Sequence, residues 1–378
     1  MGIGLLPILS GSVLGIILVA GLWPFQAPKN DVTWLSGGGL HFGPHGSLLS
    51  RGAFANPENK DSASIELWLR PDRPRSSRVI LSFDSPSGPF APFLLRQDRD
   101  SLVVLEPNRD RDGIYHTAWL PVKGVFRGNQ TVFVTVTLGP QATSVYIDGA
   151  LAQSFPILAP SNRFLLGQLV VADSPSVADS WSGEVLGLAF YRQELSSQQV
   201  TADYRNWKTN RRPAMAEESA TIAWYSFGEG MGNVAHSQRD AAADLIVPAR
   251  FFVLHPIFLR PPWREYRANL SYWKDAGVNV GGFIPLGFCF VACFSSLVRL
   301  KKPVAATIVF GFLTSLSIEV LQFWLPTRGS GMTDLMTNTF GTALGVCFYR
   351  WPFTQELLER AGALRGAIVT IGSDRGSL

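Results

Sequence analysis

Long apolar runs lie near both ends of the chain, and a long polar region separates them. Apolar residues fill residues 3–23, and later fill about 280–300, 304–325 and 335–351. A helix needs about 20 mostly apolar residues to cross a bilayer, so these runs predict four spans. A cleaved signal peptide is the rival for the first run. An uncleaved anchor is favoured because no Lys or Arg precedes the run and Trp23-Pro24-Phe25 is a poor cleavage site.

The polar middle, residues 28–250, predicts an all-β sandwich. Short stretches of alternating apolar and polar residues are separated by turn residues, a pattern typical of strands. Asp148-Gly149 predicts a tight hairpin turn, and residues 195–207 predict one helix capped at Ser196-Ser197. The expected strands are residues 63–69, 78–83, 93–97, 102–106, 131–138, 144–147, 168–172, 184–191 and 223–227.

Proline, aromatic and basic residues set the expected boundaries and orientation. Residues 251–274 are rich in proline and aromatics, which suits a linker at a membrane surface. Arg299, Lys301 and Lys302 separate two of the runs, and the C-terminal end of the chain carries Arg350, Arg360, Arg365 and Arg375. Cytoplasmic loops are enriched in Lys and Arg, so both termini are expected in the cytoplasm and the β region outside, with the helices occupying 1–27 and 275–352. An amphipathic segment, 353–364, is expected at the inner membrane surface.

Polar residues interrupt the last apolar runs at helical spacing. The Glu319 and Gln322 pair and the Asp334 and Asn338 pair each share one helix face. The segment 326–331 contains proline and glycine, which end a helix and allow the two spans to fold back on each other. Charged groups at bilayer depth are costly and usually face a partner or a cavity. We therefore expect a polar cluster facing outward, formed by Asp275, Asn279, Glu319, Gln322, Arg328, Asp334 and Asn338.

Two explanations of this cluster remain open. An arginine among carboxylates can bind a phosphate or a carboxylate in a bidentate way, so the cluster is a candidate ligand site. Alternatively, it is a structural network between helices, for example an Arg328–Asp334 ion pair. If the protein is an enzyme, Glu319 and Asp334 are the candidate acid or base, although no catalytic residue is assigned.

The composition of the chain argues against several kinds of partner and site. Hydrophobic residues make up 46% of the chain and the net charge is only +4, so no nucleic-acid partner is expected. The three cysteines have no disulfide or zinc spacing, and no metal or cofactor is expected. No calcium-binding motif is present in the β region, but several loop carboxylates are candidate calcium ligands. They are Asp84, Asp98, Asp100, Asp110 and Asp112. Trp119, Trp181 and Trp207 are candidates for stacking on sugars, with core packing as the alternative.

Three segments of the β region resemble LamG-like, concanavalin A-type jelly rolls. They are Ser64-Ile-Glu-Leu-Trp-Leu-Arg-Pro71, Ser144-Val-Tyr-Ile-Asp-Gly149 and the segment 182–195. The resemblance covers about residues 36–210. It implies a jelly-roll sandwich that binds a glycan or a protein ligand.

The C-terminal helices resemble the VanZ-like family of bacterial membrane proteins. The matching residues are Asp275, Asn279, Phe283-Ile-Pro-Leu-Gly287, Glu319, Gln322, Pro326, Arg328, Asp334, Asn338, Gly341 and Gly345. The resemblance covers about residues 270–350. The family has one more span just before this region, so we infer that the jelly roll is inserted after the first span, 3–23.

The VanZ-like resemblance implies an inner-membrane protein of the cell envelope with a role in resistance to teicoplanin-type antibiotics. The expected function is recognition of a lipid-linked or cell-wall component at the polar cluster, with the jelly roll adding glycan or protein binding. The alternatives are a membrane enzyme acting on a lipid-linked phosphate or carboxylate, and an anchored adhesion or receptor protein with a purely structural membrane part. The sequence leaves the identity of the ligand and the oligomeric state open.

Overall fold

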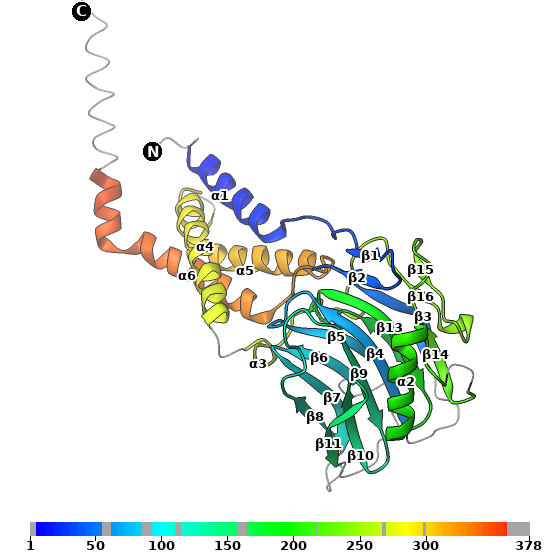
Figure 1. Cartoon of the computed structure of the whole chain (residues 1–378). Coiled ribbons are helices and arrows are strands. Elements are labelled where there is room, and N and C mark those ends of the chain that lie inside the picture. The colour runs from blue at the N-terminus through cyan, green and yellow to red at the C-terminus, as the bar shows by residue number, and fades with distance from the viewer. Residues whose placement is uncertain are drawn as a thin grey trace, which may run out of the picture. The chain divides into compact units, whose positions relative to one another are not determined.

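The computed structural model describes residues 5–54, 62–84, 93–109, 115–156, 165, 167–215, 218–266, 270–297 and 300–360. The chain forms two compact units (Figure 1). The helical unit combines Met1–Gln26 with Pro256–Leu378, and the β unit is the intervening Ala27–His255. Residues near the N-terminus therefore pack with helices more than 230 positions later in the chain, as the contacts below show.

The β unit is a sandwich of two antiparallel sheets, each with eight strands among the described residues. The strands of the first sheet are, in order, β1 (Val32–Trp34), β2 (Leu40–Phe42), β13 (Gly183–Tyr191), β4 (Ala63–Pro71), β9 (Val132–Leu138), β10 (Ala142–Ile147) and β11 (Ala150–Pro156), with β14 (Thr221–Tyr225) also paired to β13. Those of the second are β15 (Val234–Ala235), β16 (Leu245–Ile246), β3 (Leu48–Phe54), β12 (Gly167–Val171), β5 (Ser77–Asp84), β6 (Phe93–Asp98), β7 (Ser101–Arg109) and β8 (Tyr115–Val122). All nine strands expected from the sequence are present. The segment after residue 219 adds strands to both sheets and completes the sandwich.

Alternation along β4 shows how sequence becomes packing. Ile65, Leu67 and Leu69 are fully buried in the core between the sheets. The intervening Glu66 and Trp68 face the other side, as the period of two in a strand requires. Helix α2 (Ser197–Asn210) covers that outer face with Trp207.

The predicted helix and hairpin are confirmed with small shifts. Helix α2 starts after Ser196, whose hydroxyl accepts a hydrogen bond from the Gln199 amide, while the Gln199 side chain binds the Ser196 amide. This is a capping box. At the hairpin, Asp148 and Gly149 have φ of 50° and 80°, the left-handed backbone that a tight two-residue turn between β10 and β11 requires.

The helical unit contains α1 (Leu5–Leu22), the short α3 (Pro262–Glu265), α4 (Leu270–Ser295), α5 (Pro303–Gln322) and α6 (Met332–Arg350). Among the described residues, α4 and α5 are long and apolar enough to cross a membrane. Helix α4 begins at Leu270, before the apolar run expected from about residue 280, so Asp275 and Asn279 lie within it. Residues 352–360 are helical, and the rest of the expected amphipathic segment lies outside the described residues.

Helix α1 packs against the later helices. Its Leu14 and Ile17 contact a cluster that includes Phe283 of α4 and Ile318 of α5. The Ser10 hydroxyl donates to the Cys289 carbonyl at 3.3 Å. A Cβ added at Gly21 would lie 3.1 Å from Ile318. The first apolar run is thus a structural part of the helical unit.

Helices α4 and α6 approach each other through glycines. A Cβ added at Gly287 would lie 2.0 Å from the Thr342 carbonyl oxygen, and one at Gly341 would lie 2.3 Å from that of Val280. One at Gly345 would meet the Ile284 carbonyl at 2.1 Å. Real side chains essentially never tolerate such contacts, so these positions require glycine. Close packing through small residues is a common way for apolar helices to associate.

Candidate ligand-binding cavity

A cavity of about 670 Å³ opens within the helical unit. Its walls come from α1, α4, α5, α6 and the segments before α4 and α6. All seven polar residues expected to cluster line it: Asp275, Asn279, Glu319, Gln322, Arg328, Asp334 and Asn338. Six of them face a common space from α4, α5 and α6, and Arg328 reaches it from the connection between α5 and α6.

One direct side-chain contact joins α4 to α6. The Asn279 amide nitrogen donates to the Asp334 carboxylate at 2.8 Å. Asp275 lies one turn before Asn279 on the same helix and is exposed to the cavity. Two carboxylates therefore flank Asn279, and only one of them accepts its hydrogen bond.

Two carboxylates from elsewhere cap the N-terminus of α6. The backbone N–H of Gly331 donates to Glu319 at 2.7 Å, and that of Thr333 donates to Glu265 at 2.9 Å. The N-cap residue, Gly331, has no side chain to supply. The first amides of a helix lack partners within it and carry partial positive charge. Glu319 and Glu265 accept hydrogen bonds from these amides and place negative charge beside their partial positive charge. Glu319 is only 1% exposed.

Gln322 and Arg328 bind the end of α1. The Gln322 amide donates to the Gly21 carbonyl at 2.8 Å. The Arg328 guanidinium donates to the Trp23 carbonyl through Nε at 3.1 Å and Nη2 at 2.7 Å. These bonds stabilise the contact of α1 with the later helices. Among the described residues no ion pair joins Arg328 to Asp334, so the expected example of a structural salt bridge is wrong.

Asn338 lies deep in the cavity wall. It is 5% exposed, and its amide nitrogen donates to the Ser315 hydroxyl at 3.0 Å. Its Oδ1 has no hydrogen-bond partner in the described part of the chain, and neither do the hydroxyls of Thr327 and Thr333. Buried polar atoms are usually paired, so each exception needs an explanation such as a bound molecule.

Sequence reasoning missed several lining residues. Arg260, Glu265 and Ser271 line the cavity from the stretch expected to be a linker, and Thr333 from the start of α6. Two backbone bonds fix the linker against α6: Arg260 N–H to Ser330 carbonyl at 2.9 Å, and Met332 N–H to Arg260 carbonyl at 3.0 Å. The signal available was the pair of charges, Arg260 and Glu265, just before an apolar helix.

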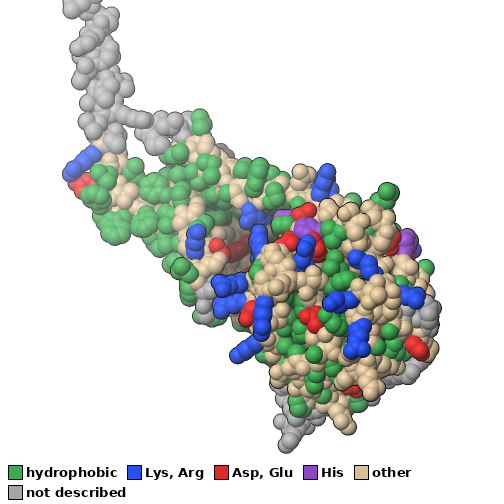
Figure 2. All heavy atoms as spheres, in the orientation of Figure 1, with side chains coloured by type: hydrophobic (Ala, Val, Ile, Leu, Met, Phe, Trp, Pro, Cys, Tyr) green, Lys and Arg blue, Asp and Glu red, His purple; other side chains and the backbone are tan. Residues whose placement is uncertain are grey.

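The surface of the helical unit is apolar outside the cavity. Large exposed hydrophobic side chains lie along its helices, including Ile16, Val309 and Leu313, and hydrophobic side chains cover most of its visible face in Figure 2. Of the cysteines, Cys289 is buried, Cys293 is half-buried and Cys347 is exposed, and all are free. The first two pack as small hydrophobic residues.

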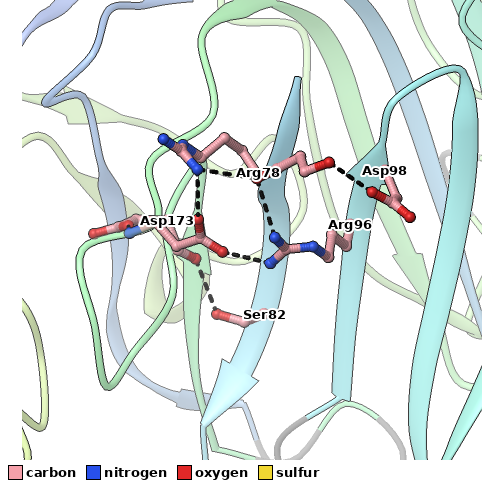
Figure 3. A network of polar contacts seen from close by, with 7 residues as sticks. Arg78, Ser82, Arg96, Asp98 and Asp173 are labelled. Atoms are coloured by element: carbon pink, nitrogen blue, oxygen red, sulfur yellow. Dashed lines mark hydrogen bonds and ion pairs between the residues drawn. The ribbon is translucent and has the colours of Figure 1, made fainter. Parts of the chain in front are cut away.

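The calcium candidates of the β unit do not converge. Asp84 pairs with His255, and Asp98 accepts from the Ser77 hydroxyl at 2.5 Å (Figure 3). Asp100 binds the neighbouring Ser101 hydroxyl. Asp110 and Asp112 lie outside the described residues. Within the described ranges, no three carboxylate, imidazole or thiolate groups form a metal site.

Trp181 and Trp207 are core residues. Both are fully buried, and their indole nitrogens donate to Gln97 and Glu66 respectively. Trp119 differs, since it is 52% exposed on the edge strand β8. Of the tryptophans proposed for stacking on sugars, only Trp119 is accessible.

Buried carboxyl groups in the β unit have raised pKa values. Burial and the nearby Asp203 raise the pKa of Glu66 well above its usual range, although Tyr191 and Trp207 donate to it at 2.7 and 2.9 Å. Burial raises the pKa of Asp173 to about 7, although the Asp179 amide donates to it at 2.8 Å. Next to Asp173, Arg78 and Arg96 bind the Asp179 carboxylate (Figure 3).

Two family models match separate regions of the chain. The VanZ/LLP1 family model matches residues 219–354, and a model of the concanavalin A-like lectin/glucanases superfamily matches residues 49–201. The first match begins inside the β unit, before β14, and does not include α1. No curated protein matches the chain.

Solved structures resemble parts of the chain only distantly. The sialidase CBM40 of Ruminococcus gnavus, bound to α2,3-sialyllactose, is 15% identical with a TM-score of 0.31, covering 38% of this chain and 82% of its own. The receptor-binding domain of botulinum neurotoxin mosaic serotype C/D is 17% identical with a TM-score of 0.35, covering 47% and 45%. The chain spans less than half the length of this toxin domain.

Both family matches agree with the folds of the units that contain most of their residues. The antiparallel sandwich fits the concanavalin A-like superfamily, and the apolar helices of the VanZ/LLP1 region indicate association with a membrane. The chain therefore joins a concanavalin A-like domain to a VanZ/LLP1 domain.

Proposed function

We propose that the protein is a multi-pass protein of the bacterial inner membrane, with α1, α4, α5 and α6 as its spans. Lys301 and Lys302 precede α5, and Arg350 ends α6, which supports a cytoplasmic position for these ends. Exposed aromatic residues lie near the opposite helix ends: Trp23, Trp263 and Trp324. Tryptophan favours the headgroup region. The cavity lies between the helix ends that carry these tryptophans, so it faces the outer side of the membrane. Residues 353–378 then form a cytoplasmic tail.

The proposed role of this cavity is to recognise a lipid-linked or cell-wall component. One observation carries the proposal: seven polar side chains spread over residues 275–338 line one cavity of the helical unit. Keeping such groups at membrane depth is costly. Arg328 and the carboxylates offer complementary charges to a polar headgroup.

A purely structural role explains only part of the cluster. Glu319 caps α6, while Gln322 and Arg328 bind α1. The exposed carboxylate of Asp275 and the unpaired Oδ1 of Asn338 stabilise no contact between the described helices. These two groups favour a binding site over a network that serves helix packing alone.

The β unit is proposed to add glycan or protein binding on the outer side of the membrane. Its exposed aromatic side chain, Trp119 on edge strand β8, supports this role, since an exposed ring can stack on a sugar. A role in resistance to teicoplanin-type antibiotics follows from the VanZ-like resemblance and belongs to the same proposal.

Separate substitutions test the function. Glu319→Gln keeps an oxygen for the Gly331 amide but removes a charge, and Arg328→Ala removes the guanidinium. Both are introduced into the native gene, with Lys274→Gln as the control, because Lys274 is exposed on α4 and does not line the cavity. We expect both variants to fold and to lose the envelope phenotype of the wild type, such as glycopeptide tolerance. Wild-type phenotype in both would leave a structural anchor as the explanation.

An enzymatic alternative has its own test. Purified protein is incubated with a polyprenyl-phosphate substrate. Turnover that Glu319→Gln or Asp334→Asn abolishes would establish an enzyme instead of a recognition protein.

A further inference from the structure

The cavity carries more negative than positive groups. Four carboxylates and two guanidinium groups line it, which gives a formal charge of −2; they are Glu265, Asp275, Glu319, Asp334, Arg260 and Arg328. A ligand that is only an anion would meet this excess of negative charge. Opposite charge within a poorly solvated space is strongly favoured, and like charge is strongly disfavoured.

One of the unpaired buried atoms among the described residues of the wall, Asn338 Oδ1, is an acceptor. Asn338 is 95% buried, and its Oδ1 has no partner in the described structure, whereas its Nδ2 is bound to Ser315. A buried carbonyl oxygen left without a donor destabilises the fold, because it has lost its hydrogen bonds to water. This acceptor and the carboxylates of Asp275 and Asp334 together favour a ligand group that donates several hydrogen bonds.

A primary ammonium suits this surface better than a metal ion. It carries one positive charge and three N–H donors. A divalent cation would need several oxygen ligands converging at about 2.0–2.6 Å, and no such group exists among the residues that the structure describes.

Arg328 still has room for an anion. Its Nε and Nη2 bind the Trp23 carbonyl, while its Nη1 has no bond within the described ranges. The guanidinium is exposed in the cavity wall. The edge formed by Nη1 and Nη2 can bind a phosphate or carboxylate oxygen.

We infer that the cavity binds a zwitterion, whose primary ammonium is held by Asp275, Asp334 and Asn338 and whose phosphate or carboxylate is held by Arg328. This inference rests on the proposed recognition function and gives the chemical class of its ligand. Two sources share this chemistry: the headgroup of an amine-bearing phospholipid, and a soluble amine-bearing wall fragment.

Phospholipids with the same acyl chains but different headgroups test the binding of the ammonium and of the phosphate separately. The purified full-length protein is titrated in detergent with phosphatidylethanolamine, phosphatidylcholine and phosphatidylglycerol, and bound lipid is counted by native mass spectrometry. Phosphatidylcholine keeps the positive charge but has no N–H donors, and phosphatidylglycerol has no cation. We expect phosphatidylethanolamine to bind about tenfold more tightly than either, since hydrogen bonds to charged groups are stronger than those between neutral groups.

Variants and a soluble competitor complete the test. The double variant Asp275→Asn, Asp334→Asn retains an oxygen for the Asn279 amide, so it should fold while losing the preference for ethanolamine. Lys274→Gln should keep it. Phosphoethanolamine that binds while phosphatidylethanolamine does not would support the zwitterion from a soluble source.

Two results would overturn the inference in different ways. Phosphatidylglycerol that binds as tightly as phosphatidylethanolamine, with both lost in Arg328→Ala, would refute the ammonium site and leave the proposed recognition of an anionic component standing. If none of these lipids binds and phosphoethanolamine does not bind either, both the inference and the recognition of such components fail together.

Discussion

The Glu319 carboxylate accepts a hydrogen bond from the backbone N–H of Gly331 at 2.7 Å. Glu319 lies in the last turn of α5, and Gly331 is the N-cap residue of α6, at the far end of the connection between the two helices. The bond therefore fixes the start of α6, and with it the positions of Asp334 and Asn338. A residue expected to contact ligand is also part of the framework that positions the site.

Two substitutions separate these roles of Glu319. Glu319→Ala leaves the Gly331 amide without its acceptor and should lower the free energy of unfolding by about 1–3 kcal/mol. Glu319→Gln retains an acceptor and should cost less. Thermal unfolding of the purified chain in detergent measures both, with Glu356→Ala as the control because its pair with Arg360 is exposed. Equal losses in the two Glu319 variants would contradict the capping role.

Glycine positions on α4 and α6 should respond to alanine with opposite signs. Gly341→Ala and Gly345→Ala place a Cβ against a backbone carbonyl of α4 and should destabilise the helical unit by about 1–3 kcal/mol. Gly281→Ala meets nothing within 4 Å and should be neutral or slightly stabilising, since alanine favours a helix. The midpoint of thermal unfolding measures the difference. Tolerance of alanine at 341 and 345 would mean that the helices do not pack this closely.

Stability of the β unit should fall as the pH rises from about 4 to about 7. The pKa of Asp173 is about 7 in the folded protein because of burial, and near 3.9 in an unfolded chain. Between these values the folded state binds the extra proton, so raising the pH favours unfolding, and the effect levels off above about 7. Burial of Glu66 acts in the same direction.

Hydrogen exchange of the full-length protein, corrected for the intrinsic effect of pH, measures this change in strands β5 and β12. Asp173→Asn should flatten the dependence while keeping an oxygen for the Asp179 amide. Asp100→Asn, at an exposed position, serves as the control. Stability that increases between pH 4 and 7 would contradict the assignment.

Cysteine labelling tests the proposed orientation. Gly329 is exposed with open space around it, and Lys301 is exposed before α5. In a variant in which Cys289, Cys293 and Cys347 are replaced by alanine, an impermeant maleimide should label Gly329→Cys in intact cells. It should label Lys301→Cys only after the membrane is opened. The reverse pattern would invert the topology.

The fold was predictable where side chains alternate. Buried strands such as β4 and β9 carry a clear apolar signal, and Asp148-Gly149 strongly predicts a turn. The strands missed were β1, β2, β3, β8, β11, β15 and β16. Strand β11 is almost entirely exposed at a sheet edge, so no apolar pattern identifies it. Strands β15 and β16 have two residues each, and only pairing with distant residues defines them.

The cavity was predictable from helix faces but not from loops. Regular spacing places Glu319 with Gln322 and Asp334 with Asn338, so the four lining positions followed from the helical period. Arg260 lies in an irregular segment before α4, and Glu265 lies in α3, which has only four residues, so no helical period predicts the direction of either side chain. Their positions depend on contacts with distant residues: Arg260 forms backbone bonds with residues 330 and 332, and Glu265 accepts from the Thr333 amide.

The most direct test of the central claim is to count the envelope molecules that remain bound to the purified wild-type chain, by native mass spectrometry, and to compare Arg328→Ala, the double variant Asp275→Asn, Asp334→Asn, and Lys274→Gln. A recognition cavity predicts one defined molecule on the wild type and on Lys274→Gln, and its loss from the other two. The same bound species in all four proteins, or none in any, would contradict it.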